Sequence, residues 1–263
     1  MSHTRKPFRR RLALTVTSAV CAALVAVPAF ADDCDYREPR ERTLDATGVE
    51  LVEIDAGAGF LRVEGVKGSE VRVAGEACAS SSRLLEQVKL EVRRTGDRVR
   101  IIAEMPDGGW GRSTSRLDLD IEVPADVEVE IDDGSGEIEL RGVAAADIDD
   151  GSGELEVYDI AGDLEIDDGS GEIEVEQVGG EVRISDGSGE IELRSVGSVL
   201  IEEDGSGEID IEGVNGDVMV RSDGSGSISV RDVEGDFTVR RDGSGGIKHR
   251  AVVGQVRIPD DDR

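Results

Sequence analysis

The sequence predicts an all-β protein whose second half is a parallel β-solenoid with about 18 residues per rung. The first observation is the tetrapeptide Asp-Gly-Ser-Gly, which recurs seven times at spacings of 17 to 19 residues. A short, fixed period of this kind is typical of a solenoid. Second, apolar and polar residues alternate twice within each repeat, which indicates two short strands per rung. Third, aromatic residues make up only 3% of the chain while Val, Ile and Leu are abundant, which favours regular β packing.

Residues 1–31 have the pattern of a secretory signal peptide. They hold five basic residues and no acidic one, and residues 12–27 form an apolar run that is followed by small residues up to Ala31. We therefore expect cleavage after Ala31 and an exported protein, either periplasmic or outside the cell. A membrane anchor is the alternative, but the run is short for a bilayer core of about 30 Å. No later segment is apolar enough to cross a membrane.

Two cysteines, Cys34 and Cys78, remain after such a cleavage. In an oxidising compartment a pair of cysteines suggests one disulfide. It would close a loop of about 45 residues and stabilise the fold by roughly 4 kcal/mol in the chain-entropy account. Two unpaired thiols are the alternative.

Residues 32–131 are expected to form an irregular β region that begins with a diverged rung. Residues 53–73 follow the logic of the later repeats, with a corner that starts at Asp55 and a second strand through Val71 and Val73.

Two further strand pairs follow within this region. Residues 89–106 alternate on both sides of Gly96, which predicts a hairpin. Residues 117–131 alternate again on both sides of Pro124, which predicts two more strands.

Residues 132–263 are expected to form seven rungs. One corner of each rung is Asp-Gly-Ser-Gly, and the other is a Gly-containing segment that follows 11 to 12 residues after the Asp. A single rung buries too little apolar surface to fold alone, so stability must come from stacking on its neighbours. In the unit 169–186 the inward-facing residues are predicted to be Ile173, Val175, Val178, Val182 and Ile184.

The Asp of each tetrapeptide has a structural role in this prediction. Its side chain accepts a backbone N–H two residues further on, and the glycines take the conformations that a tight corner needs. The seven corner residues are Asp133, Asp150, Asp168, Asp186, Asp204, Asp223 and Asp242.

Three segments in this order resemble a known family: EIDAGAGFLRVEGVKGSEVRV, then VRRTGDRVRIIAEMP, then LDLDIEVPADVEVEIDDGSGEIEL. Over roughly residues 45–260 the chain is similar to a bacterial β-strand-repeat family of putative adhesins, a domain of unknown function. The resemblance implies a right-handed, β-helix-like fold in an exported protein, and it implies no established activity.

The charge of the chain is strongly negative and is concentrated in one segment. The formal net charge is −29, and removal of residues 1–31 makes it −34. Residues 132–220 hold 28 acidic and three basic residues, whereas residues 221–263 hold eight of each. This argues against a nucleic-acid binder, because a phosphate backbone requires a basic surface. It suggests instead a basic partner for the acidic rungs.

Stacked rungs place equivalent carboxylates about 4.8 Å apart, a spacing that Ca²⁺ can bridge. An alternative function is therefore a Ca²⁺-binding solenoid. The simpler interpretation is that these carboxylates form a solvated acidic face without a bound ion. One candidate column is Glu137, Glu154, Glu172, Glu190 and Glu208. The other is Glu139, Glu156, Glu174 and Glu192, continued by Asp210.

The sequence lacks the side chains of the common catalytic centres. After cleavage it has one His and two cysteines, which leaves no Ser-His, Cys-His or zinc constellation. We therefore expect a non-enzymatic, adhesin-like scaffold of the cell envelope or surface, with no cofactor other than the Ca²⁺ of the alternative. A β-helix enzyme acting on polysaccharides is the remote alternative.

Overall fold

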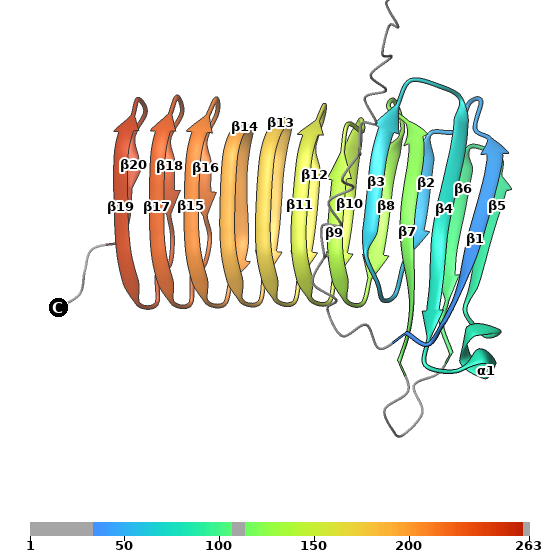
Figure 1. The fold of residues 1–263 in the computed structure, drawn as a ribbon. Helices are drawn as coiled ribbons and strands as arrows, with labels where there is room; N and C mark the ends of the chain where they lie inside the picture. Colours follow the sequence, from blue (N-terminus) through green and yellow to red (C-terminus); the bar gives the residue numbers. More distant parts are fainter. Residues whose placement is uncertain (1–33, 107–113, 260–263) are drawn as a thin grey trace, which may run out of the picture. The chain divides into compact units, whose positions relative to one another are not determined.

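The structure is a computed structural model that describes residues 34–106 and 114–259. The predicted signal peptide, residues 1–31, lies outside the described residues. The described chain is almost entirely β-structure and contains a parallel solenoid of about seven turns, which confirms the predicted fold class (Figure 1). These described residues form one compact unit.

The first part of the chain contains seven strands and one short helix, α1 (Ser82–Leu85). The strands are β1 (Tyr36–Asp45), β2 (Leu51–Asp55), β3 (Leu61–Val66), β4 (Glu70–Ala79), β5 (Lys89–Thr95), β6 (Arg98–Glu104) and β7 (Ser115–Pro124).

The repeated rungs supply the remaining strands. These are β8 (Glu128–Asp133), β9 (Gly136–Arg141), β10 (Ala145–Asp150), β11 (Gly153–Ile160), β12 (Leu164–Asp168), β13 (Gly171–Asp186), β14 (Gly189–Asp204), β15 (Gly207–Val214), β16 (Val218–Val220), β17 (Gly226–Val233), β18 (Phe237–Val239), β19 (Gly245–Val252) and β20 (Val256–Arg257).

The rungs stack into two parallel ladders. One ladder runs through β3, β9, β11, the first parts of β13 and β14, then β15, β17 and β19. The other runs through β2, β8, β10, β12, the second parts of β13 and β14, then β16, β18 and β20. Equivalent residues of successive repeats pair with each other, so the sequence period is also the register.

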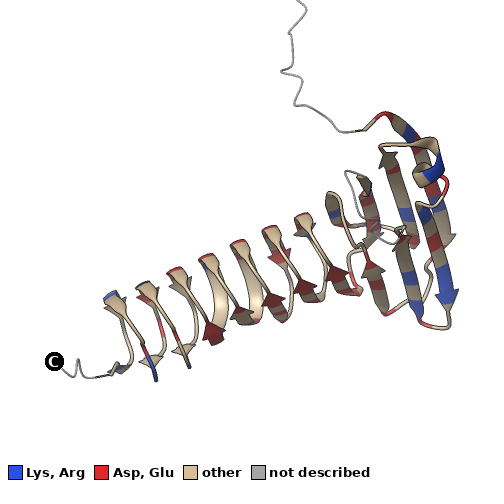
Figure 2. Ribbon diagram, turned by 90° about the horizontal axis from the view of Figure 1, so that it is seen from below, with Lys and Arg blue, Asp and Glu red and all other residues tan. Residues whose placement is uncertain are grey.

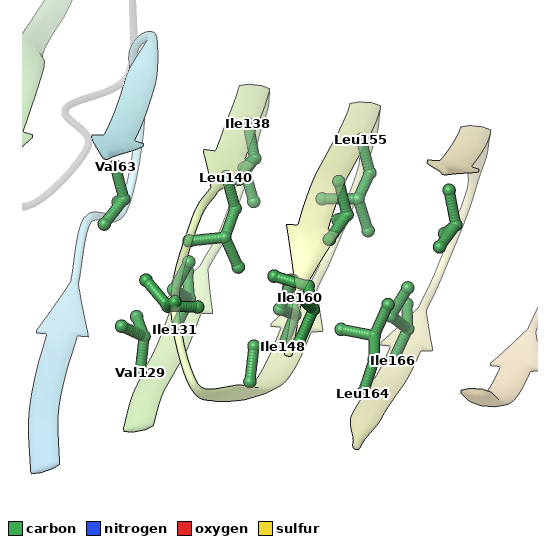
Figure 3. Close-up of a cluster of buried hydrophobic side chains, with 14 of the residues drawn as sticks. Val63, Val129, Ile131, Ile138, Leu140, Ile148, Leu155, Ile160, Leu164 and Ile166 are labelled. Atoms are coloured by element: carbon green, nitrogen blue, oxygen red, sulfur yellow. The ribbon is translucent and has the colours of Figure 1, made fainter. Parts of the chain in front are cut away.

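Aliphatic side chains from both ladders fill the space between them (Figure 3). The five inward positions predicted for the unit 169–186 are all buried. Leu155 pairs in register with Ile173, so each aliphatic side chain packs on its equivalent in the next rung. This continuous core explains why one rung depends on its neighbours.

Close stacking at the Asp-Gly-Ser-Gly corner requires its second glycine. A Cβ built on Gly171 would lie 1.6 Å from the carbonyl oxygen of Gly153 in the rung before it. No side chain fits at that distance, so the corner is specified by steric exclusion as well as by turn chemistry.

The opposite corner differs from its sequence-based description. The left-handed residue of the turn is the one nine positions after the corner Asp, for example Gln177 with φ 64°, and it is a glycine only at Gly142 and Gly213. Gly179 serves the stacking instead, because a Cβ there would lie 2.4 Å from the carbonyl oxygen of Ala161.

Two details of the predicted first rung were wrong. Asp55 pairs with Asp132, so the corner position equivalent to Asp133 is taken by the small, buried Ala56. The strand that contains Val71 and Val73, β4, does not return within the rung. It pairs antiparallel with β1 and β7 and so widens the sheet.

The predicted hairpin around Gly96 is confirmed, with β5 antiparallel to β6. β6 is parallel to β2, and β7 is parallel to β3. Because β5 pairs antiparallel with β6, and β4 pairs antiparallel with β7, antiparallel strands extend both ladders at the first rung.

Cys34 and Cys78 form a disulfide with a Cα–Cα distance of 5.6 Å, which joins the residues before β1 to β4.

Candidate functional site

The inner side of the Asp-Gly-Ser-Gly corner is lined by the corner carboxylates. Six of them are at most 7% exposed, and the seventh, Asp242 in the last rung, is half-buried. Oδ1 of Asp150, Asp168 and Asp186 accepts the N–H of the Ser two residues further on, at 3.0 to 3.2 Å. Each corner therefore faces the core with a carboxylate.

Exposed carboxylates flank the same corner on both sides, and we call them together the corner ridge. The first row follows the corner and consists of Glu137, Glu154, Glu172, Glu190 and Glu208. The second row precedes the corner and consists of Asp132, Asp149, Asp167 and Glu203. Both rows run in register from rung to rung, with Ser185 interrupting the second.

Among the described residues, the ridge carboxylates have no cationic partners. Within residues 34–106 and 114–259, none of the nine forms an ion pair. A shallow groove of about 520 Å³ runs beside the second row, and Asp149, Asp167 and Glu203 line it together with corner glycines. The ridge is thus an accessible, uncompensated line of negative charge.

Two carboxyl groups of the first row, Glu154 and Glu190, have raised pKa values. Partial burial, and then the neighbouring Glu side chains, raise the pKa of Glu154 and of Glu190. A basic group placed against the row would reverse the second of these causes.

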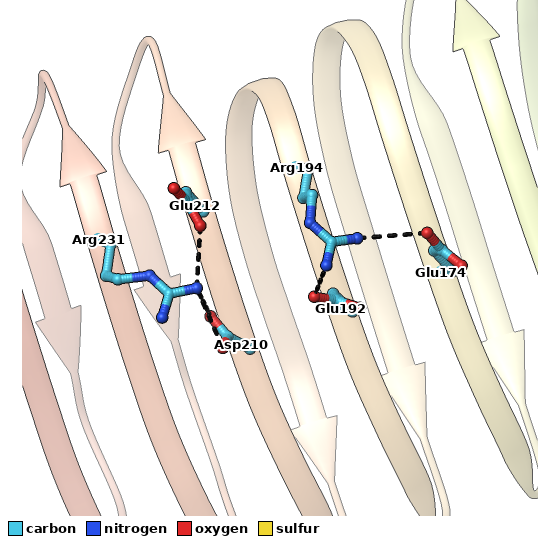
Figure 4. A network of polar contacts seen from close by, with 6 residues as sticks. All are labelled: Glu174, Glu192, Arg194, Asp210, Glu212 and Arg231. Atoms are coloured by element: carbon cyan, nitrogen blue, oxygen red, sulfur yellow. Dashed lines mark hydrogen bonds and ion pairs between the residues drawn. The ribbon is translucent and has the colours of Figure 1, made fainter.

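The other predicted column is compensated by arginines (Figure 4). Arg194 lies between Glu174, at 3.2 Å, and Glu192. Arg231 lies between Asp210, at 3.0 Å, and Glu212, at 2.9 Å.

The same column is compensated at its first residue. Glu139 contacts Arg62 at 2.7 Å and Arg141 at 3.6 Å. Among the described residues, every member of this column except Glu156 thus already contacts a guanidinium group, which makes the first row the better candidate.

The acidic columns end after β15 (Figure 2). In the rungs after β15, Ser227 and Gly246 take the register positions of the first row. Ser229 and Lys248 do the same in the column that Asp210 continues. The ridge therefore extends over the rungs from β8 to β15.

The Ca²⁺ assignment of the Glu columns stays a prediction. Among the side chains that the structure describes, no group of three or more His, Cys, Asp or Glu is arranged to hold a metal ion. The columns offer one carboxylate per rung in a straight line, whereas Ca²⁺ takes six to eight oxygen ligands around one point.

Sequence reasoning missed the second row of the ridge. The signal was present, because the residue before the corner Asp is acidic in several repeats, as at Asp132, Asp149 and Asp167. Its meaning emerges only when the register brings these residues beside the first row.

No known protein family matches this sequence, and no curated protein matches it. Solved structures do. A putative adhesin from Parabacteroides merdae is 12% identical, with a TM-score of 0.45, over 86% of this chain and 97% of that one. A putative lipid binding protein from Parabacteroides distasonis is 15% identical, with a TM-score of 0.43, over 84% and 97%. A putative cell adhesion protein from Clostridium sporogenes is 12% identical, with a TM-score of 0.34, over 85% and 100%.

The one helix in the described part of the chain, α1, has four residues. Over these residues, no helix combines the length and the hydropathy that a bilayer span requires.

Proposed function

We propose that this protein is an exported, non-enzymatic interaction scaffold of the cell envelope or surface, and that the corner ridge binds a basic partner. The observation that carries the proposal is the ridge itself: nine exposed carboxylates in two rows without a cationic partner among the described residues. Export is supported by the signal-like residues 1–31.

The geometry of the ridge suits a partner with an extended basic surface. Five rungs at about 4.8 Å carry the first row over roughly 20 Å, which matches the size of a protein–protein contact patch rather than a small-molecule pocket. A line of like charge on a rigid scaffold steers an oppositely charged partner and fixes its orientation. Neighbouring columns, already paired with arginines, contribute less to this field.

The partner can be sought by capture from an envelope extract with three immobilised proteins. The first is the wild type, and the second is the triple variant Glu154→Gln, Glu172→Gln, Glu190→Gln. The third is a matched control at the opposite corner, Asp159→Asn, Asp232→Asn, Glu234→Gln, which removes the same charge from exposed positions.

We expect a basic protein that the wild type and the control retain and the ridge variant loses. Equal retention by all three proteins would contradict the ridge as the binding surface. Turnover of an acidic or neutral glycan by the purified protein would contradict the non-enzymatic assignment.

Ca²⁺ binding by the first row is a second candidate, favoured by the same unpaired register of Glu154, Glu172 and Glu190. If it is correct, millimolar Ca²⁺ raises the melting midpoint above that measured in EDTA, and the triple ridge variant abolishes the difference. An identical midpoint in both buffers would remove this candidate.

A further inference from the structure

The corner Asp residues form a continuous column along the inside of the solenoid. Strand register places each directly beside its equivalent in the next rung, from Asp133 to Asp242. Six of the seven are at most 7% exposed. A row of buried carboxylates spaced about 4.8 Å apart is costly if every member is charged.

Backbone contacts satisfy only part of this column. Oδ1 of Asp150, Asp168 and Asp186 accepts a backbone N–H, but Oδ2 of each has no hydrogen-bond partner. Both carboxylate oxygens of Asp133, Asp204 and Asp223 also lack one. Because buried polar atoms are almost always hydrogen-bonded, these oxygens indicate a missing donor.

The charged groups around the column do not supply that donor. Asp55 and Asp132 lie near Asp133 at the first corner. Farther along, Asp149, Asp167 and Glu203 line the groove outside the column. All of these groups are acidic.

Arg240 and Arg241 line a hollow with Asp223 and Asp242 at the last rungs. Arg100 lines another with Asp55 and Asp132 beside the first corner. Over the residues described, no Lys, Arg or His forms an ion pair with a corner Asp.

The donor is available within the column itself. Register places Asp168 beside Asp186, Asp204 beside Asp223, and Asp223 beside Asp242. Two ionised carboxylates have no proton to donate, so a hydrogen bond between such neighbours requires that one of them be a carboxylic acid.

We propose that the corner Asp column is a proton-sharing ladder, in which a protonated corner Asp donates to the carboxylate of the next rung and the bound protons hold the corners together. The protons come from solvent, and no other group gains or loses a proton. The column therefore makes the stability of the solenoid sensitive to pH.

The sign of this effect follows from the pKa values. Burial raises the pKa of Asp133, Asp150 and Asp186 to about 6 and that of Asp204 to about 7, from an ordinary value of 3.8. The folded protein thus binds protons more tightly than the unfolded chain does. The stabilisation is complete below pH 3.8 and is lost as the pH rises through 6 to 7.

The test is the melting midpoint between pH 5 and pH 8 at constant ionic strength. We expect the midpoint to be higher at pH 5 by about 5 °C or more. Asp186→Asn should raise the midpoint at pH 8 and reduce the pH dependence, since the amide carries no charge and donates to the next carboxylate. The control Asp167→Asn, at the exposed neighbouring position, should leave the pH dependence unchanged.

A second measurement covers the case in which Asp186→Asn fails to fold. Carboxyl ¹³C NMR titration of the wild type should show several Asp groups with midpoints above pH 5. A midpoint that is flat or falls toward pH 5, or Asp titrations all near pH 4, would overturn the proposal. It would also be overturned if Ca²⁺ at pH 8 restored the midpoint as fully as acid does, because a metal would then be the neutralising ligand.

Discussion

The strands β1–β7 and the rungs from β8 onward build the same two ladders by different means. In the rungs, each strand pairs in parallel with its equivalent from the neighbouring repeat. In the first region, β1, β4 and β7 pair antiparallel across long loops, and a disulfide closes the chain over 44 residues. Repetition specifies the rungs, whereas particular long-range contacts specify the first region.

The two regions also treat charge differently. In the first region arginines pair with acids, as Arg72 does with Glu70 at 2.7 Å and with Glu122 at 2.9 Å. In the rungs the ridge carboxylates have no cationic partner within the part of the chain that the structure describes, although stability alone would favour compensation. Mutual repulsion disfavours such a charge pattern. Its presence on an otherwise regular scaffold is consistent with the proposed role in binding.

The largest effect is expected from steric conflict in a repeated corner. Gly171→Ala places a Cβ against the backbone of the preceding rung, which cannot move without disturbing both ladders. We expect a loss of more than about 4 kcal/mol in the free energy of unfolding, or no folded protein. Denaturant unfolding measures it.

Two glycines with open surroundings are the controls, Gly68 in the first region and Gly246 in the last rung. Replacement by Ala should change stability by no more than about 0.5 kcal/mol. If Gly171→Ala were as mild as these, close stacking would not be what defines the corner.

The disulfide should matter next, and it belongs to the first region alone. The double variant Cys34→Ser, Cys78→Ser frees a loop of 44 residues in the unfolded chain. We expect a loss of about 2–4 kcal/mol, measured by denaturant unfolding without reductant. Reductant should lower the stability of the wild type to that of the variant, and a variant as stable as its parent would contradict a stabilising disulfide.

A smaller effect separates the charge environments of the two regions. Arg194→Gln leaves Glu174 and Glu192 uncompensated among other acids, so we expect a melting midpoint lower by about 1–3 °C at low salt. Arg72→Gln should have less effect, since the Arg72 side chain is more exposed than that of Arg194 and its ion pairs are more strongly screened by solvent. The difference between the midpoint changes of the two variants should vanish in high salt. If it persisted there, the lost packing of the Arg194 side chain would be its cause.

The sequence allowed the rungs to be predicted well, since period-two alternation, corner chemistry and register all follow from one repeat. Contacts that occur once were harder. The antiparallel course of β4 depends on β1, and no local pattern of Val71 and Val73 reveals that partner. The register between β13 and β14 shifts by one residue between Val178 and Glu181, which places Ile201 beside Ile184 in the core. It shifts back after Ile184, and the extra residue, Glu202, meets Arg183 and Arg221.

The site was predictable only in part, for the same reason. The first Glu row follows from the repeat alone. The second row required knowledge of which residues flank the corner in space, and the arginine pairing of Glu174 and Glu192 required side-chain positions.

The most direct test of the ridge is a titration of the purified protein with a decalysine peptide at low and at physiological salt. We expect the triple variant Glu154→Gln, Glu172→Gln, Glu190→Gln to weaken the affinity by about tenfold or more at low salt, roughly 1.4 kcal/mol. The control Asp159→Asn, Asp232→Asn, Glu234→Gln, with the same loss of charge, should change the affinity by less than about threefold. Equal weakening by both variants would show that net charge alone drives binding and would contradict the ridge as a located interaction site.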